Sequence, residues 1–451
     1  MKKTLLIALA IAACAFGCSK KQDEVQTPTQ ESIASQDSIV KDGVDTGAAD
    51  VQENVKNTAD RVCQLPEYQD DIDARQWADA NNAFGFKLLA HVSANSQEKG
   101  NVVSPYSAER AIGMVLDGAC GSTLTQIYGA MSLPLAKNVS AAGAEVDKYF
   151  KEEFGPNVTI DIDNKVWVEQ TISLLDDYAN SLKANYDIDV RNVDFKADPE
   201  GARKAINDDI YQATHEKISE LIQKGMITSL TRAVLTNAIY FKAPWVDNFK
   251  PENTDKADFF TADGAVKVDM MHHTNRHRVY VDDKLTAVEL RFAESAFALI
   301  VLMPTAGDQP DALKSLQESM DANTFRELAL KMNSQETILS LPKFKIETSI
   351  PLNSLLKSLG MTTAFTDAAD FSRMTGDTDL LISDVIQKAF IDVNENGAEA
   401  AAATAVVMRT KSMIRPDPSE PIKVTIDHPF MYALVEGQSG AILFLGDVKK
   451  I

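Results

Sequence analysis

The sequence predicts an α+β fold, in which helices and strands do not alternate regularly. Short, strongly apolar runs at residues 165–168, 233–241 and 298–303 are typical of central β-strands. Helical patterns fall between these runs without one following each strand, which argues against a doubly wound parallel sheet. Apolar residues make up 45% and charged residues 24% of the 451-residue chain, so the protein can bury a sizeable core.

Several individual helices and strands can be located from periodicity. Trp77, Phe84, Leu88 and Val92 recur at helical spacing and predict a first amphipathic helix. A serine followed by a proline is typical of a helix start and predicts that a second, buried helix begins at Ser104. The other predicted elements are a helix at residues 351–359 that is ended by Gly360, and strands at residues 339–346 and 441–448.

The N-terminus has the features of a lipoprotein signal peptide, residues 1–18. Two lysines precede an apolar run at residues 5–16, which is too short for a permanent membrane anchor. The run ends at Cys18, where it resembles a bacterial lipobox, and polar residues follow at once. We therefore expect Cys18 to carry a lipid that holds the protein in the bacterial cell envelope, on the periplasmic or the surface face of the outer membrane. Cys14 is an alternative lipidation site, and a plain secretory signal is the simpler alternative.

Residues 19–75 are expected to form a disordered, acidic tether between this anchor and a folded domain. Acidic residues outnumber basic ones in this segment, and no aromatic residue precedes Tyr68. Such a composition cannot bury enough apolar surface to offset the conformational entropy of folding. The segment contains Cys63, which could pair with Cys120 in an oxidising compartment, although two cysteines far apart in sequence do not establish a disulfide.

The charge and the histidines limit the possible ligands. A formal net charge of −20 argues against a protein that mainly binds nucleic acid or an anionic membrane surface. His272, His273 and His277 are close enough to suggest a metal site, but no nearby cysteine or obvious carboxylate completes it. We therefore expect no metal and no cofactor.

Catalytic motifs are scarce. Ser354 and Lys357 match the Ser-x-x-Lys pattern of penicillin-recognising enzymes, but its partner motifs are missing, and the two residues more simply form the solvated face of a helix. Residues 437–440 faintly resemble a nucleophile elbow, yet they lie between two apolar runs, as a hairpin turn does. His428 is interpreted as a structural, hydrogen-bonding histidine. We expect no enzymatic activity.

From about residue 76 to the end, the chain resembles the serpin family in a series of motifs that follow the family's order and spacing. These motifs are at residues 101–107, 118–123, 236–242, 341–347, 359–365, 369–372 and 427–430. The resemblance implies one serpin domain at residues 76–451, with three β-sheets, eight or nine helices and an exposed reactive loop at about residues 395–416.

The resemblance also implies a region that controls the opening of the central sheet. Its residues in this sequence are Ser104, Asn237, Trp245 and Gln387. Gln387 departs from the family, which usually has histidine at this position, in a buried polar cluster near Asn237. Glutamine can also donate and accept hydrogen bonds, so we expect the cluster to be rewired without a change of fold.

The start of the reactive loop resembles the hinge of inhibitory serpins. The hinge residues are Glu395, Gly397, Ala398, Glu399, Ala400, Ala401, Ala402, Ala403 and Thr404. An alanine run alone would predict a helix. As a strand, the segment would turn Ala398 and every second residue after it to one side, and Glu399 to the other. Small side chains can enter a packed sheet without clashing, while the charge stays on the row that can remain in water.

Family spacing puts the scissile bond between Lys411 and Ser412, where Lys411 is fourteen residues beyond the hinge glycine. Lysine at this position favours trypsin-like serine proteases, whose specificity pocket carries a carboxylate. Arg409 is a second basic site, and Met408 could suit elastase- or subtilisin-like enzymes.

The resemblance therefore implies a monomeric suicide-substrate inhibitor of serine proteases, with cysteine proteases as a further target class. Its cleaved loop would insert into the central sheet and trap the acyl-enzyme. The alternative is a non-inhibitory serpin that acts as a carrier, chaperone or adhesion module. The small hinge residues weigh against this alternative, because a loop that never inserts has no need to stay small.

Overall fold

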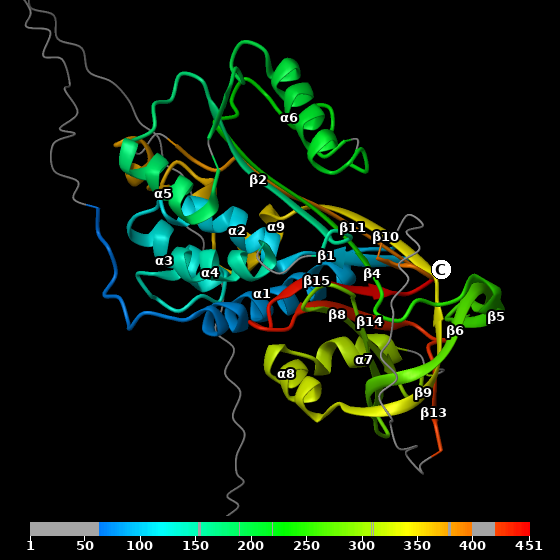
Figure 1. Cartoon of the computed structure of the whole chain (residues 1–451). Helices are drawn as coiled ribbons and strands as arrows, with labels where there is room; N and C mark the ends of the chain where they lie inside the picture. Colours follow the sequence, from blue (N-terminus) through cyan, green and yellow to red (C-terminus); the bar gives the residue numbers. More distant parts are fainter. Residues whose placement is uncertain are drawn as a thin grey trace, which may run out of the picture. The chain divides into compact units, whose positions relative to one another are not determined.

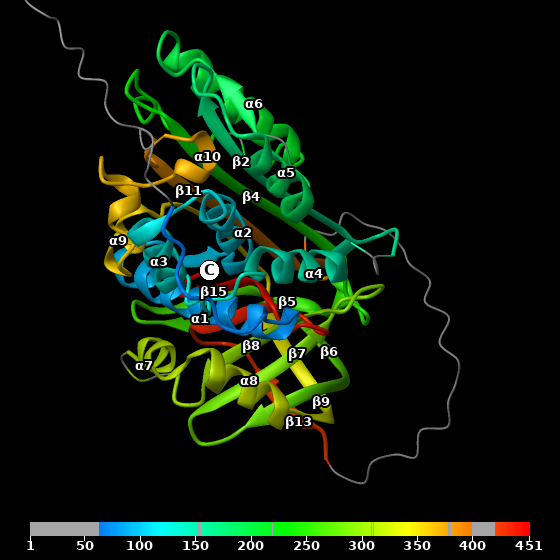
Figure 2. The same ribbon diagram turned by 90° about the vertical axis from the view of Figure 1, so that its left-hand side faces the viewer.

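The computed structural model describes residues 63–151, 155–188, 190–218, 220–307, 309, 311–377, 380–398 and 420–451. These residues form two β-sheets, with helices packed against them (Figures 1 and 2).

The six-stranded sheet has the strand order β10-β11-β12-β4-β2-β3. Its strands are β2 (Thr159–Glu169), β3 (Arg191–Val193), β4 (Ala233–Pro244), β10 (Phe344–Pro351), β11 (Asp384–Asn394) and β12 (Gly397–Ala398). Nearly every residue of β4 is buried, as expected for a central strand that is covered on both faces.

Helices cover both faces of this sheet. On one face lies α6 (Pro199–Ala213), whose apolar side forms a separate small core with β2 and β4 (Figure 2). On the other face lies α2 (Pro105–Leu116), which is buried along its whole length. Ser104 caps α2 by accepting a hydrogen bond from the backbone N–H of Ser107 at 3.1 Å, so this helix starts where the sequence predicts. Further helices are α1 (Ala74–Asn95), α3 (Gly121–Ala130), α4 (Val139–Lys151), α5 (Asp176–Tyr186), α9 (Asn353–Ser358) and α10 (Ser372–Thr375), with a 3-10 turn at Thr363–Phe365.

The nine-stranded sheet has the order β1-β15-β14-β8-β7-β6-β9-β13, and β5 pairs with β6. Its strands are β1 (Gly100–Val103), β5 (Thr254–Thr261), β6 (Gly264–Val281), β7 (Leu285–Arg291), β8 (Phe297–Pro304), β9 (Asn333–Pro342), β13 (Ile422–Thr425), β14 (Phe430–Glu436) and β15 (Ile442–Val448). The helices α7 (Ala312–Ser319) and α8 (Ala322–Lys331) and the 3-10 turn Pro251–Asn253 complete this part of the structure. Within the described ranges, no helix is both long and apolar enough to cross a membrane.

The predicted α+β class is confirmed, but the numbers of sheets and of helices differ from those predicted. Within the described residues, hydrogen bonding joins the strands into two sheets instead of three. The reason is the 18-residue β6, which pairs with β5 through residues 264–271, with β9 through residues 270–279 and with β7 through residues 278–281. It thus connects strand groups that would otherwise be separate. The same residues form ten α-helices instead of eight or nine, and the shortest, α10, has only four residues.

The predicted tether is wrong in its last part, because the chain is attached to the folded body from Cys63 onward. Cys63 forms a disulfide with Cys120, with a sequence separation of 57, which on loop-closure entropy is worth about 4 kcal/mol. Further along, the Asn138 side chain bonds the backbone N–H and carbonyl of Ile72, which is itself a core residue. A crosslink and a few contacts therefore hold a segment whose composition suggests disorder.

The strand predicted at residues 339–346 is instead two strands in different sheets. β9 ends at Pro342 and β10 begins at Phe344. Between them, the backbone N–H of Lys343 bonds the carbonyl of Asp269 on β6, at 2.9 Å. The apolar run is continuous because the chain stays buried while it passes from one sheet to the other, and periodicity does not reveal such a change of sheet.

Candidate functional site: the opening of the six-stranded sheet

The two central strands of the six-stranded sheet pair along half of their length and then separate. β4 and β11 run parallel and pair from Val234 with Asp384 to Ile239 with Ala389. Beyond this point β12 lies between them, antiparallel to both. Ala398 pairs with Val393 on one side and with Ala243 on the other. The sheet is therefore closed at one end and has begun to accept an extra strand at the other.

The two residues of β12 fit this narrow space because they are small. The side chain of Ala398 is 1% exposed and belongs to the main core. Gly397 has φ +147°, and a Cβ atom at this position would lie 2.0 Å from the carbonyl oxygen of Ala243. Only glycine can therefore bring the chain this close to β4. Ala398 lies on the buried row, as the alternation of strand side chains requires.

The segment just before β12, the hinge start (residues 394–396), is bound to the chain that follows β4. The backbone N–H groups of Trp245 and Phe249 donate to the carbonyls of Asn396 and Glu395, each at 3.0 Å. The indole Nε1 of Trp245 donates to the carbonyl of Asn394 at 2.9 Å. Residues 245–249 thus fix the hinge start by three hydrogen bonds.

An ion pair adds to this attachment. The carboxylate of Glu395 lies 3.0 Å from Nζ of Lys343 and accepts a hydrogen bond from the Thr254 hydroxyl at 3.0 Å. Burial acts against the charged form of Glu395, but hydrogen bonds from its own backbone N–H, Lys343 and Thr254 hold the pKa of the carboxyl below its usual value. The sequence predicts a role for Glu395 but not for its partners Lys343 and Thr254. Lys343 lies just before β10 and Thr254 begins β5, and no local signal links either residue to the loop.

A buried polar cluster connects β4 and β11 where the two strands still pair. Gln387 Nε2 donates to the side-chain oxygen of Asn237 at 2.9 Å and to the carbonyl of Ser104 at 2.8 Å. In return, Gln387 Oε1 accepts from the backbone N–H of Ser104 at 3.1 Å. Asn237 also donates to Ser107 and Asn164, which sequence reasoning missed. Gln387 thus bonds both β4 and the cap of α2, and β4 cannot separate from β11 here without breaking the Gln387–Asn237 hydrogen bond.

Trp245 lies apart from this cluster. The structure brings Ser104, Asn237 and Gln387 together, but it places Trp245 beside the hinge start, where its ring stacks on Phe292 with centroids 4.3 Å apart. The four residues predicted to control sheet opening therefore lie at two places: Ser104, Asn237 and Gln387 join β4 and β11, and Trp245 binds the hinge start.

Other predicted positions fall outside the described residues. They are Cys18, Glu399, Ala400, Ala401, Ala402, Ala403, Thr404, Met408, Arg409, Lys411 and Ser412.

The motifs that suggested other chemistry have ordinary roles in the described structure. Ser354 and Lys357 are exposed on α9. Residues 437–440 form the hairpin turn between β14 and β15, and the carboxylate of Glu436 accepts both the N–H and the hydroxyl hydrogen of Ser439. His428 bonds the carboxylate of Asp427 at 2.7 Å. No group of three metal-ligating side chains occurs within the described part of the chain.

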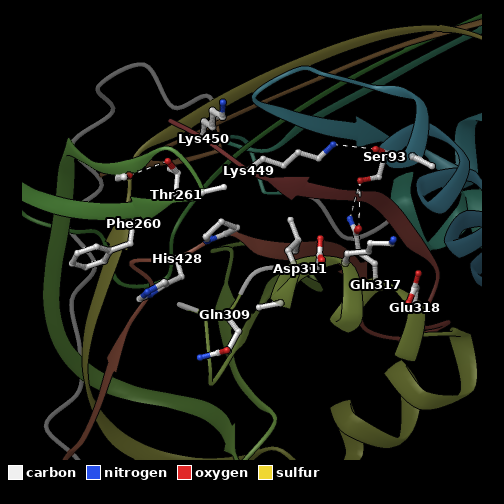
Figure 3. Close-up of a pocket in the computed structure, with 18 of the residues that line it drawn as sticks. Ser93, Phe260, Thr261, Gln309, Asp311, Gln317, Glu318, His428, Lys449 and Lys450 are labelled. Carbon is white, nitrogen blue, oxygen red and sulfur yellow. Dashed lines mark hydrogen bonds between the residues drawn. The ribbon is translucent and has the colours of Figure 1, made fainter.

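A cavity of about 890 Å³ lies between α1, α7, the β5–β6 hairpin and the C-terminus (Figure 3). Several of its polar groups bond other protein groups: Lys449 donates to the carbonyls of Ser93 and Ser96, and Gln317 donates to Ser93 and to the buried Asp447. On the opposite wall His428 stacks on Phe260, with ring centroids 5.1 Å apart. The cavity has the size of a ligand site, but these groups are already engaged within the protein.

Comparisons with known proteins agree with this architecture. Residues 79–451 match the model of the family described as Serpin (serine protease inhibitor). The human leukocyte elastase inhibitor is 33% identical over 378 residues, which cover 82% of this chain and 98% of that protein. This chain therefore belongs to the serpin family, a family named for inhibition of proteases and not for catalysis.

Solved structures show the same fold. The crystal structure of Serpin48 from the insect Tenebrio molitor aligns with a TM-score of 0.73 and 30% identity, covering 83% of this chain and 98% of that one. Human thyroxine-binding globulin, in complex with its hormone, aligns with a TM-score of 0.74 and 26% identity, with the same coverage. Neighbours of this chain thus include both a serpin described as highly specific and a thyroxine-binding protein.

Proposed function

We propose that this protein is a suicide-substrate inhibitor of serine proteases. The observation that carries the proposal is β12: the first residues of the hinge already lie as a strand between β4 and β11, with Ala398 on the buried row. Alanine occupies five of the next seven positions, residues 399–405, so this segment can continue along the same path. A loop without an inserting role would have no need of this composition.

The register of β12 defines the path of the rest of the loop. Antiparallel pairing continued from Ala398 with Ala243 and Val393 brings Ala402 opposite Ile239 and Ala389. Two residues further, Thr404 arrives between Asn237 and Gln387. Insertion would thus replace the amide–amide hydrogen bond that now joins β4 and β11 with contacts to a threonine hydroxyl, and the polar cluster would stay satisfied.

The mechanism follows from the length of this strand. Attack on the Lys411–Ser412 bond by the protease serine forms an acyl ester on the Lys411 carbonyl and frees the Ser412 amine. About 14 residues at ~3.3 Å each then make a strand of roughly 45 Å. The protease, still joined through the ester, would be carried to the far end of the sheet and distorted before water could release it. Loop insertion of this kind, in serpins generally, adds a strand to a sheet and releases strain that the uncut protein stores.

A carrier function is the alternative, and the cavity in Figure 3 is the feature that would favour it. A gel under denaturing conditions separates the possibilities. An inhibitor gives a protein–protease adduct that survives denaturation, a non-inhibitory serpin is only cut, and an enzyme is not consumed. Absence of the adduct with trypsin-, elastase- and subtilisin-like proteases would overturn the proposal.

Inhibition of trypsin should depend mainly on Lys411. Lys411→Ala removes the cation that fits the carboxylate of the trypsin specificity pocket, so we expect trapping to slow by at least about tenfold, which corresponds to ~1.4 kcal/mol in the barrier. Arg409→Ala is the matched control and should change the rate much less. A larger effect of Arg409→Ala, or an adduct that maps to Arg409, would show that the scissile bond lies two residues earlier.

We also propose that the protein is anchored to a bacterial envelope membrane by a lipid on Cys18. The support is the short apolar run that ends at Cys18, and the spacer that follows it before the chain is fixed at Cys63. Mass spectrometry of the mature N-terminus should find a lipid-modified cysteine at position 18. A lipid on Cys14, or an unmodified chain that begins elsewhere, would contradict this assignment.

A further inference from the structure

Two histidines face each other beneath the hinge start. His273 and His277 project from β6 with their Nε2 atoms 2.8 Å apart, and their rings are stacked with centroids 4.9 Å apart. The other ring nitrogen of His277, Nδ1, lies 3.2 Å from the carbonyl oxygen of Glu289 on β7. Both rings line a cavity of about 300 Å³ next to Trp245.

This geometry requires the neutral form of His277. A carbonyl can only accept, so Nδ1 of His277 carries its hydrogen and donates to Glu289. Nε2 of His277 is then the acceptor, and His273 donates to it. A proton on Nε2 of His277 would place two donors face to face at 2.8 Å, and the hydrogen bond between the rings would be lost.

The surroundings do not offer a free counter-charge for such a proton. The charged side chains around the pair are Arg276 and Arg278 on β6, Glu289 and Arg291 on β7, and Asp247 in the segment after β4. The carboxylate of Glu289 is already paired with Arg278 at 2.6 Å. Three guanidinium groups against two carboxylates make this a poor place for two imidazolium ions or for a divalent cation.

The pair supports the segment that binds the hinge start. The ring of Phe249 lies flat on the ring of His273, with centroids 4.1 Å apart and 12° between the planes. The backbone N–H of the same Phe249 donates to the carbonyl of Glu395. A displacement of the His273 ring therefore acts directly on one of the three hydrogen bonds that fix the hinge start.

We propose that the His273–His277 pair is a proton-sensitive latch on sheet opening: the neutral pair holds residues 245–249 against the hinge start, and protonation separates the rings and releases it. This inference rests on the proposed function in one respect only: after its release, the hinge start would enter the six-stranded sheet.

The direction of the pH dependence follows from the burial of the rings. Burial, and for His273 also the neighbouring His277, lowers the pKa of both, that of His273 to about 4. The latched form therefore binds fewer protons than an open form. In the open form the two rings are separated and solvated, and each has the pKa of a free histidine. Latching is fully favourable above about pH 6.5 and weakens as the pH falls toward 4. A histidine whose pKa is about 4 in the latched form and about 6.5 in the open form makes opening up to about 30-fold more favourable between pH 7.5 and pH 5.

Hydrogen exchange of the Trp245 and Phe249 amides tests the latch without any protease. In a buffer with a metal chelator, the wild-type protein should lose protection in the peptide 245–249 by up to about 30-fold between pH 7.5 and 5, after correction for intrinsic exchange. The double variant His273→Gln/His277→Gln keeps a donor and an acceptor between the two positions but cannot take a proton at either, so its protection should hardly change with pH. The double variant His273→Phe/His277→Gln keeps the stack on Phe249 and serves as a second variant without a titratable ring.

His272→Gln is the matched control. His272 is the next residue on β6 and bonds Ser340 and Asp255 instead of the pair, so this variant should lose protection as the wild type does. Protection that is independent of pH in the wild type, or that falls in the two double variants as much as in the wild type, would overturn the latch. A chain that never inhibits a protease would still give a result in this experiment, so failure of the latch and failure of the inhibitory function are distinguishable.

Discussion

An Ala398→Arg variant is expected to be cut by the target protease instead of trapping it. Ala398 is 1% exposed and lies between Val393 of β11 and Ala243 of β4, where the structure leaves no room for a longer side chain. An arginine that followed the same path would bury an unpaired charge, at a cost of several kcal/mol. Insertion competes with deacylation, and a barrier raised by only ~1.4 kcal/mol slows insertion about tenfold.

The measurement is the number of inhibitor molecules consumed per protease inactivated, which should rise from about one to at least ~10 in Ala398→Arg. Cleavage itself should continue, because the scissile bond is far along the loop from residue 398. Glu399→Arg is the matched control, since it changes a charge on the opposite, solvated row and should cost little. One-for-one trapping by Ala398→Arg would contradict the register that β12 defines. So would a Glu399→Arg variant that consumes as many inhibitor molecules per protease as Ala398→Arg does.

The sequence predicts well those features that depend on neighbours along the chain. The buried face of α1, the Ser104 cap of α2 and the turn before β15 all follow from local periodicity or local chemistry. The need for a glycine at 397 follows only once its 2.0 Å approach to Ala243 is known.

The attachment of the hinge start could not be predicted in the same way. Lys343, Thr254 and Phe249 reach Glu395 from three segments that are 52 to 146 residues away in sequence. No periodic pattern couples such positions, because the contacts exist only after the strands have taken their order in the two sheets. The same holds for Ile72, whose backbone N–H and carbonyl both bond the side chain of Asn138, 66 residues away. Composition indicates whether a segment would fold in isolation. Whether it is ordered in the protein depends on contacts with residues that are distant in sequence and that the fold brings near.

Cleavage of the reactive loop should raise the thermal midpoint of unfolding. In the uncut protein, β4 and β11 share a parallel ladder of six residue pairs, and insertion replaces it with two antiparallel ladders, the arrangement that β12 already begins. If each of about 14 inserted residues adds roughly one net hydrogen bond worth ~1 kcal/mol, a domain of this size should melt roughly 15 °C higher. Calorimetry before and after limited cleavage measures the change, and cut Ala398→Arg, which should insert poorly, is the control expected to gain little. A midpoint that stays the same or falls in the cut wild-type protein would falsify loop insertion, because the uncut state would then not be the strained one.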